Sequence, residues 1–143
     1  MKIKFLLADE FRAEAAGKQM ALGLYADDII ILEHKEASKE VAKAGLPAGI
    51  DRLAFLINVS DVPEVKHIYK MQIIDPSGSP HGKEIPLGEH VIAKGTSRSF
   101  VIEAKPFLIQ GAGTYQLNFF IDDVIHTFSF TLIEREGTKS TIS

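Results

Sequence analysis

Alternation of apolar and polar residues with a period of two dominates this sequence, and it is clearest near the C-terminus. Two alternating runs, Thr114 to Ile121 and Val124 to Ile133, flank the dipeptide Asp122-Asp123. Strict alternation indicates β-strands rather than helices. With the dipeptide as a hairpin loop, the same-face pairs are Ile121 with Val124, Phe119 with His126, Leu117 with Phe128, and Tyr115 with Phe130. Aromatic pairs of this kind stabilise an antiparallel ladder.

Shorter runs with strand character lie upstream and are separated by turn sequences such as Asp75-Pro76-Ser77-Gly78. The expected strands are 53–60, 65–74 and 98–104, with shorter candidates at 29–32 and 90–94. Many short strands with turns between them are typical of a sandwich or barrel. We therefore predict an all-β fold, an immunoglobulin-like antiparallel β-sandwich of about 7–9 strands.

The N-terminal alternation predicts a first hairpin that runs from Ile3 to Leu24. With Ala16-Gly17 as its two-residue turn, Ala13 lies opposite Met20 and Phe11 lies opposite Leu22. Tight hairpin turns prefer Asn or Gly at the first loop position, which is Ala16 here. A short helical turn over residues 9–16 therefore remains the alternative.

One segment, Glu33 to Ala44, does not have strand character. It is rich in Glu, Lys and Ala and is followed by Gly45 and Pro47, which are helix stop signals. A short surface helix near 34–44 and a charged loop both fit it. The chain of 143 residues is one domain in length, and we expect the sandwich to occupy 1–133 and a polar tail to occupy 134–143.

Composition indicates which cellular compartment and which partners to expect. The formal net charge is −3 with both signs mixed along the chain, so we expect no nucleic-acid partner. The sequence has no cysteine, which fits a reducing compartment. The early apolar run, Phe5 to Ala8, is too short for a signal peptide, and no run is long enough to span a membrane. We expect a cytoplasmic protein that has no membrane partner.

Tyr115 follows Gly113 by two residues at the start of the penultimate strand. This arrangement resembles the tyrosine corner of immunoglobulin-like sandwiches, in which the phenol bonds to backbone a few residues upstream. The resemblance implies that Tyr115 is a structural anchor with its ring in the core. The paired cysteines and buried tryptophan of that family are absent from this sequence.

The opening Ala8-Asp9-Glu10-Phe11-Arg12-Ala13-Glu14, with Gly17-Lys18 and Gly23-Leu24-Tyr25, resembles a family of small uncharacterised bacterial β-sandwich proteins. The resemblance implies a fold and no activity. On a strand, Glu10, Arg12 and Glu14 share one face, which predicts a solvent-exposed ion-pair ladder of structural importance only. Exposed pairs of this kind contribute about 0 to 1 kcal/mol. The functional alternative is a site built from these residues and Asp9.

No catalytic, cofactor-binding or metal site emerges from the remaining polar residues, and we expect a protein that is not an enzyme and holds no cofactor. The carboxylate pairs are adjacent in sequence, so on a strand they point to opposite faces rather than across a cleft. Two of them, Asp27-Asp28 and Asp122-Asp123, are best interpreted as turns. No histidine lies in a metal-binding motif. His67 and His126 could meet only if their strands were neighbours.

Three apolar residues break the alternation on what should be the wet face of the last hairpin: Phe120, Ile125 and Ile133. An apolar break of this kind marks a contact surface. We expect a module for protein–protein contact or self-assembly, with these three residues as the candidate interface and a homodimer as the favoured state. The alternative is a small-ligand or carbohydrate binder that uses end loops such as 76–86, and the third possibility is an enzyme.

Overall fold

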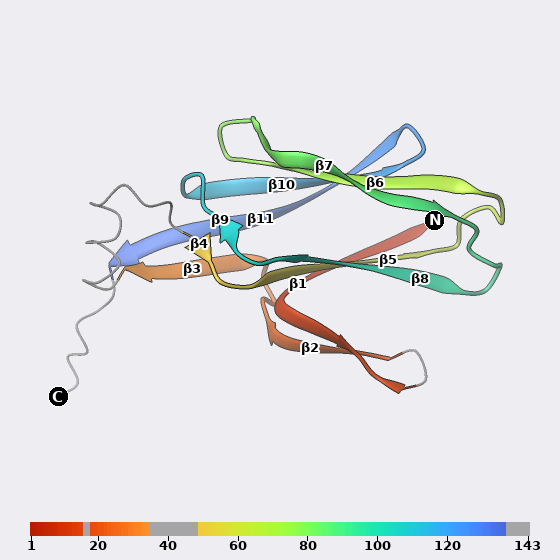
Figure 1. Ribbon diagram of the computed structural model, residues 1–143, viewed down its shortest axis with the longest axis horizontal. Coiled ribbons are helices and arrows are strands. Elements are labelled where there is room, and N and C mark those ends of the chain that lie inside the picture. Colours follow the sequence, from red (N-terminus) through yellow and green to blue (C-terminus); the bar gives the residue numbers. More distant parts are fainter. Residues whose placement is uncertain (16–17, 35–48, 137–143) are drawn as a thin grey trace.

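The computed structural model describes residues 1–15, 18–34 and 49–136, and it is a β-sandwich (Figure 1). Strands make up about 70% of the described chain, and none of its elements is an α-helix, so the predicted all-β sandwich is confirmed. In chain order the strands are β1 (Lys2–Ala13), β2 (Gln19–Leu24), β3 (Ile29–His34), β4 (Gly49–Ile50), β5 (Leu53–Ser60), β6 (His67–Ile74), β7 (Pro80–His90), β8 (Ser97–Ala104), β9 (Phe107–Leu108), β10 (Gly113–Ile121) and β11 (Val124–Glu136).

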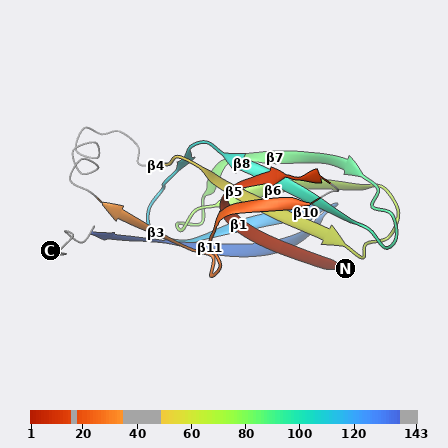
Figure 2. The same cartoon turned by 90° about the horizontal axis from the view of Figure 1, so that it is seen from below.

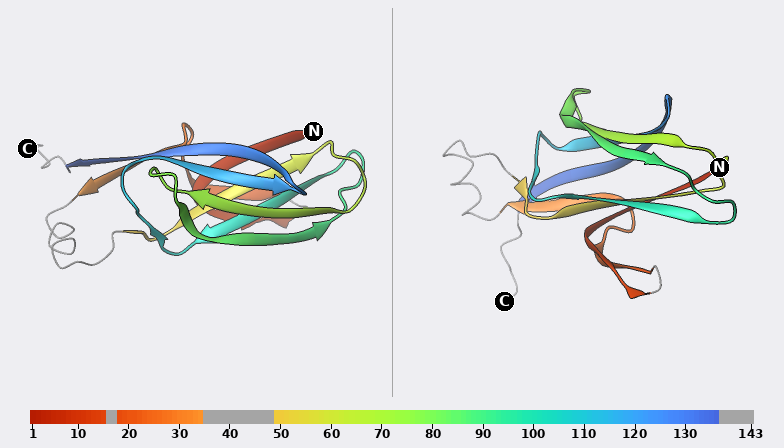
Figure 3. Two further views of the ribbon diagram at one scale, coloured as in Figure 1. Left: turned by 90° about the horizontal axis from the view of Figure 1, so that it is seen from above. Right: turned by 45° about the vertical axis from the view of Figure 1, so that its right-hand side comes forward.

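Two sheets face each other as two layers in Figure 1 and in the right-hand view of Figure 3, and they overlap when seen from below (Figure 2). One has the order β2-β1-β5-β8 and the other β3-β11-β10-β6-β7, while β4 and β9 form a separate short pair. All pairs are antiparallel except that of β3 with β11, which is parallel and departs from the antiparallel arrangement that we predicted. The core lies between the sheets and is rich in aromatic side chains; its largest fully buried members are Phe55, Tyr69, Phe107, Tyr115, Phe119 and Phe130.

The β10–β11 hairpin has the predicted register. Tyr115 pairs with Phe130, Leu117 with Phe128 and Phe119 with His126, so every predicted pair is confirmed. The register of this hairpin is well determined because a slip of one residue would move all apolar side chains of its inner face into water.

The β1–β2 hairpin is present, but its predicted register is wrong by one residue. Ala13 lies opposite Gln19 and Phe11 opposite Ala21. The first half of β1 pairs with β5, and the second half pairs with β2 and projects from the sandwich as an arm (Figure 1). The register error arises because the arm is not part of the main core. Phe11 instead clusters with Leu56 and two alanines on the outer face of the four-stranded sheet.

Strand structure in β1 continues to Ala13, so the helical alternative is wrong for residues 9–13, and Ala15 alone has helical geometry, of the 3-10 type. The expected turn residues 16–17 lie outside the described residues.

β7 was missed by the sequence prediction, which placed a loop at 76–86 and a strand at 90–94. The strand runs from Pro80 to His90, and residues 91–96 are not in a strand. The sequence of this segment suggested a loop because it contains Pro80, Pro86 and two glycines. β7 is an edge strand with register shifts against β6, and edge strands tolerate proline because one side has no partner.

Two predicted boundaries also change. The polar tail was expected to begin at residue 134, but β11 continues to Glu136 because β3 pairs with it there. The expected helix near 34–44 lies outside the described residues except for His34, which ends β3. None of the described elements is a helix that could cross a membrane.

Candidate interaction surface

The outer face of the five-stranded sheet is mostly polar but carries two apolar patches. We call the first the tip patch: Ile68 on β6, Phe120 on β10 and Ile125 on β11. Ile68 is 51% exposed and Ile125 is 54% exposed, while Phe120 is half-buried. Phe120 and Ile125 are direct partners in the β10–β11 register. The tip patch therefore lies beside the β10–β11 turn.

The second patch, here the edge patch, consists of Ile29, Ile31 and Ile133, which are 42%, 49% and 43% exposed. Ile133 pairs with Ile31 across the parallel β3–β11 ladder. The sequence prediction grouped Ile133 with Phe120 and Ile125. Those residues share a face, but Ile133 lies eight positions along β11 from Ile125, which is roughly 27 Å at about 3.4 Å per residue. The candidate interface is therefore split into two patches.

Charged groups around the tip patch are paired with one another. The ammonium of Lys70 lies 4.8 Å from the centroid of the Phe120 ring, a cation–π contact. The same ammonium lies 3.5 Å from Oε1 of Glu84 on β7. The Lys70 side chain therefore covers part of the Phe120 ring.

His67 and Asp122 close the turn beside the tip patch, and the sequence prediction missed their contact. Nδ1 of His67 lies 2.8 Å from Oδ2 of Asp122, and Nε2 lies 3.1 Å from the carbonyl oxygen of Pro63. The amide of Ile68 donates to Oδ1 of Asp122 at 2.9 Å, and the amide of Asp122 donates to the carbonyl of Ile68 at 2.8 Å. Asp122 has φ of 54°. The turn was predicted, but the partner from β6 depends on the strand order.

The hydrogen bond between the two side chains shifts both pKa values. It raises the pKa of His67 above its ordinary value, with further help from the Pro63 carbonyl. It lowers the pKa of the Asp122 carboxyl, with help from the Ile68 amide. Each shift stabilises the charged form of its own group.

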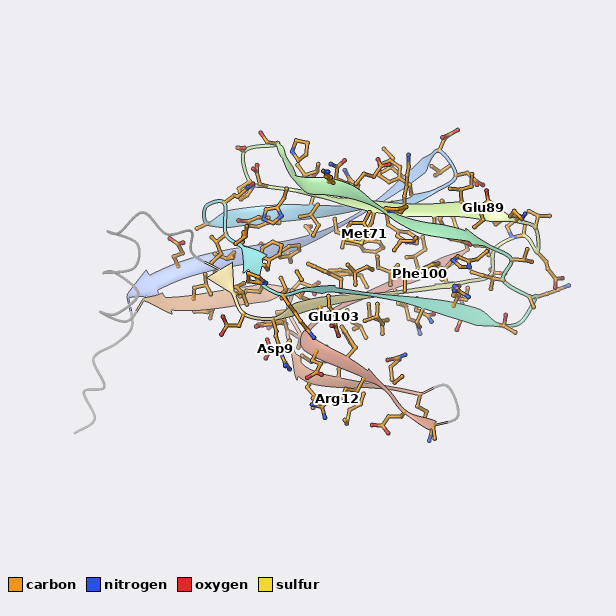
Figure 4. All side chains as sticks on the ribbon, in the orientation of Figure 1. Asp9, Arg12, Met71, Glu89, Phe100 and Glu103 are labelled. Carbon is orange, nitrogen blue, oxygen red and sulfur yellow. The ribbon has the colours of Figure 1, made fainter. Side chains whose placement is uncertain are left out.

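A separate open cavity of about 520 Å³ lies at the base of the β1–β2 arm. Asp9, Glu10 and Gly23 line it from the arm, and Asp51 and Arg52 line it from the segment between β4 and β5. Figure 4 shows Asp9 and Arg12 on the arm, outside the space between the sheets that holds Met71 and Phe100.

Hydrogen bonds fix the residues at this arm base. The Tyr25 hydroxyl donates to Oδ1 of Asp9 at 2.7 Å, and the guanidinium of Arg52 lies 3.0 Å from Oε2 of Glu10. Partial burial, reinforced by the Asp9 carboxylate, raises the pKa of Tyr25 to about 12. The Arg12 guanidinium, more than any other group, lowers the pKa of Glu10.

The predicted ladder of Glu10, Arg12 and Glu14 forms only in part. Arg12 is exposed and donates to Glu10 at 3.2 Å through Nε. Glu10 also forms an ion pair with Arg52. Among the described contacts, Arg12 does not pair with Glu14. Arg52 comes from a distant segment, so spacing within β1 could not reveal it.

Tyr115 makes the contacts that the tyrosine-corner resemblance implies. Its side chain is buried, its hydroxyl donates to the Gly111 carbonyl at 2.7 Å, and it accepts from the Gln110 amide at 3.0 Å. The ring is stacked on Phe130 at 5.3 Å between centroids.

His67 and His126 do not meet, because β10 lies between β6 and β11. Nε2 of His126 is buried and has no hydrogen-bond partner among the described residues. Within the described part of the chain, no group of three or more His, Cys, Asp or Glu residues could hold a metal ion.

No protein-family model and no curated protein matches the chain. Solved structures with similar coordinates include the Pseudomonas fluorescens alkylpurine DNA glycosylase AlkC bound to DNA containing an abasic site analog, at 12% identity and TM-score 0.44. The match covers 76% of this chain and 28% of that one. A β-glucosidase from Listeria innocua in complex with glucose has 7% identity and TM-score 0.44, over 95% of this chain and 16% of that one. The chain thus spans less than a third of either protein, and likeness this low assigns it no function.

Proposed function

We propose that this chain is a non-enzymatic β-sandwich contact module that self-associates as a homodimer through the tip patch. The observation that carries the proposal is the exposure of Ile68 and Ile125, each just over half exposed, on a sheet face that is mostly polar. Burying a large aliphatic side chain contributes about 1.5–3 kcal/mol, so roughly 1 kcal/mol per isoleucine is still to be gained in each copy.

The charges around the tip patch favour a second copy over a charged partner. Lys70 is paired with Glu84, and Asp122 is paired with His67, so the patch offers little uncompensated positive charge to a nucleic acid or an anionic surface. A two-fold interface brings identical surfaces together and needs only a self-complementary apolar patch.

The tip patch is favoured over the edge patch because its two isoleucines are the more exposed. Ile68 and Ile125 are 51% and 54% exposed, whereas the isoleucines of the edge patch are 42–49% exposed.

An immunoglobulin-like topology is part of the same proposal. The order β1-β5-β8 in one sheet and β11-β10-β6-β7 in the other supports it, because it matches strands A-B-E and G-F-C with one further strand. We also propose a bacterial, cytoplasmic setting, which is supported by the family resemblance and by the absence of cysteine.

The first prediction tests the tip patch by sedimentation velocity. The double change Phe120→Ser with Ile125→Thr removes the apolar contact surface, so we expect the wild-type dimer to become a monomer. Ile125→Lys alone places a charge in each half of the interface, leaves the half-buried Phe120 in place, and should give the same result.

The matched control is Ile31→Thr with Ile133→Thr, which changes two isoleucines of the edge patch on the same sheet face. This variant should remain dimeric. Circular dichroism should show that all variants keep the β-sandwich. A wild-type monomer at high micromolar concentration contradicts the proposal, and loss of the dimer in the control alone moves the interface to the edge patch.

A further inference from the structure

The tip patch is built from two parts of the chain that meet at Asp122. Ile68 belongs to β6, whereas Phe120 and Ile125 flank the β10–β11 turn. The backbone of Ile68 is joined to Asp122 by two hydrogen bonds, one through the carboxylate and one through the amide. The carboxylate therefore extends the β6–β10 ladder and helps to fix how Ile68 lies relative to the other two residues.

The ring of His67 faces two acceptors. Nδ1 faces the Asp122 carboxylate and Nε2 faces the Pro63 carbonyl. A neutral imidazole has one N–H, so either tautomer turns a lone pair toward an acceptor oxygen. Only the doubly protonated ring donates to both. The His67 side chain is 12% exposed and the Asp122 side chain is 51% exposed, so water reaches the carboxylate more readily than the ring.

The other groups near His67 do not take over its contacts with Asp122 and Pro63. Tyr69 is 6.3 Å away between ring centroids, and His90 is the register partner of His67 on β7. Lys66 and Glu89 pair with each other at 3.5 Å beside it. The charged and titratable groups next to His67 on the packed elements are thus Asp122 and Asp123 on the turn, Lys66 and Tyr69 on and before β6, and Glu89 and His90 on β7.

We propose that protonated His67 is a latch that holds the β10–β11 turn against β6 and thereby keeps the tip patch in its association-competent arrangement. The consequence for association rests on the proposed function, whereas the latch itself is a property of the single chain. As the pH rises and the ring loses a proton, the turn loosens and self-association weakens.

The direction of the pH effect follows from the linkage between proton binding and folding. The pKa of His67 is raised in the folded chain, so its contribution to stability is complete below the unfolded value and is lost as the pH rises through the folded value. The pKa of Asp122 is lowered, so its contribution is lost as the pH falls through its folded value. The latch is therefore closed between these two folded pKa values.

The second prediction is tested by NMR on the wild-type chain at about pH 6 and about pH 8.5, on either side of the ordinary histidine range. The Ile68 and Asp122 amides should lose protection from hydrogen exchange at the higher pH, relative to the Leu117 amide in the core ladder. His67→Gln should show low protection at both pH values. Asp122→Asn, which keeps an oxygen for the Ile68 amide and suits the left-handed backbone, should remove the pH dependence.

His90→Gln is the control, since it changes the facing histidine on β7 and should keep the wild-type pH dependence. Equal protection of the two amides at both pH values, or a His67 ring that titrates at or below about 6.5, overturns the latch. In sedimentation, the wild-type dimer should dissociate more readily at the higher pH, and His67→Gln should remove that difference.

The sedimentation result separates the two proposals. A wild-type monomer at both pH values overturns the self-association, while amide protection still decides the latch. A dimer of equal strength at both pH values overturns the link between latch and interface.

Discussion

Two fully buried tyrosines of the core hold their hydroxyls in different surroundings. Tyr115 donates to the Gly111 carbonyl and accepts from the Gln110 amide. The Tyr69 hydroxyl is buried and has no hydrogen-bond partner among the described residues. Burial raises the pKa of both phenols. The sequence indicated the role of Tyr115 because its partners are local, whereas the surroundings of Tyr69 depend on the packing of two sheets.

The third prediction compares these hydroxyls. Tyr115→Phe removes a satisfied hydrogen bond and should lower the free energy of unfolding by about 1 kcal/mol. Tyr69→Phe removes a buried hydroxyl that lacks a protein partner, so it should be neutral or slightly stabilising. Urea unfolding of both variants measures the difference. An equal loss in both would contradict the assignment of Tyr115 as the anchor.

At the scale of elements, the β1–β2 arm depends on a close backbone approach at Gly23. This glycine has φ of +67°, and a Cβ built there would lie 2.2 Å from Oδ2 of Asp9. The same carboxylate accepts from Tyr25, so it is not free to move away without losing that bond. A side chain at position 23 would therefore disturb the base of the arm.

The fourth prediction is that Gly23→Ala destabilises the chain by more than the backbone strain alone, which is about 1–3 kcal/mol for a left-handed residue. The matched control is Gly95→Ala, at φ +80° with nothing near its added Cβ, which should show the strain without the clash. Urea unfolding measures both variants. Equal losses would mean that Asp9 gives way at little cost.

Local pattern predicted some elements well and others poorly. The β10–β11 hairpin was predicted pair by pair because one of its faces is buried and its turn is short. β7 was missed because Pro80 and Pro86 indicate turns when only the sequence is considered. An edge strand tolerates proline, but only the strand order shows that β7 lies at an edge. The arm register failed because Phe11 packs on the outer face of the four-stranded sheet rather than in the main core.

At the scale of the whole molecule, the candidate site was predicted in part. Phe120, Ile125 and Ile133 were identified from broken alternation, and all three lie on the outer face. Their division into two patches, and the contact of His67 with Asp122, required the sheet order because they join residues far apart in the sequence. Spacing along one strand carries no information about a neighbour that arrives from another segment.

The fifth prediction concerns the stability of the whole chain as a function of pH. Glu10, Asp75 and Asp122 have pKa values below their ordinary 4.5, 3.8 and 3.8, so their contributions are lost as the pH falls below that range. The contribution of His67 is lost as the pH rises past its raised pKa, above 6.5. The pKa of Asp28 is raised by partial burial, which offsets part of the acid loss.

Thermal melting across pH should therefore show its highest midpoint between about pH 4.5 and 6.5. In His67→Gln the decline on the alkaline side of this range should be smaller, while the acid side should be unchanged. A midpoint that keeps rising toward pH 8 in the wild-type chain would contradict the signs of these shifts.

A ribosome makes β3 long before it makes β11, the strand with which β3 pairs. Residues 29–34 and their partners 131–136 are separated by about 100 residues, which takes roughly 5–20 s to synthesise at about 5–20 residues per second. For that interval the run Ile29-Ile30-Ile31-Leu32, a segment of high β-propensity without charge, has no ladder to join. The nascent chain, more than the finished sandwich, is therefore the stage at which this protein is most prone to aggregate.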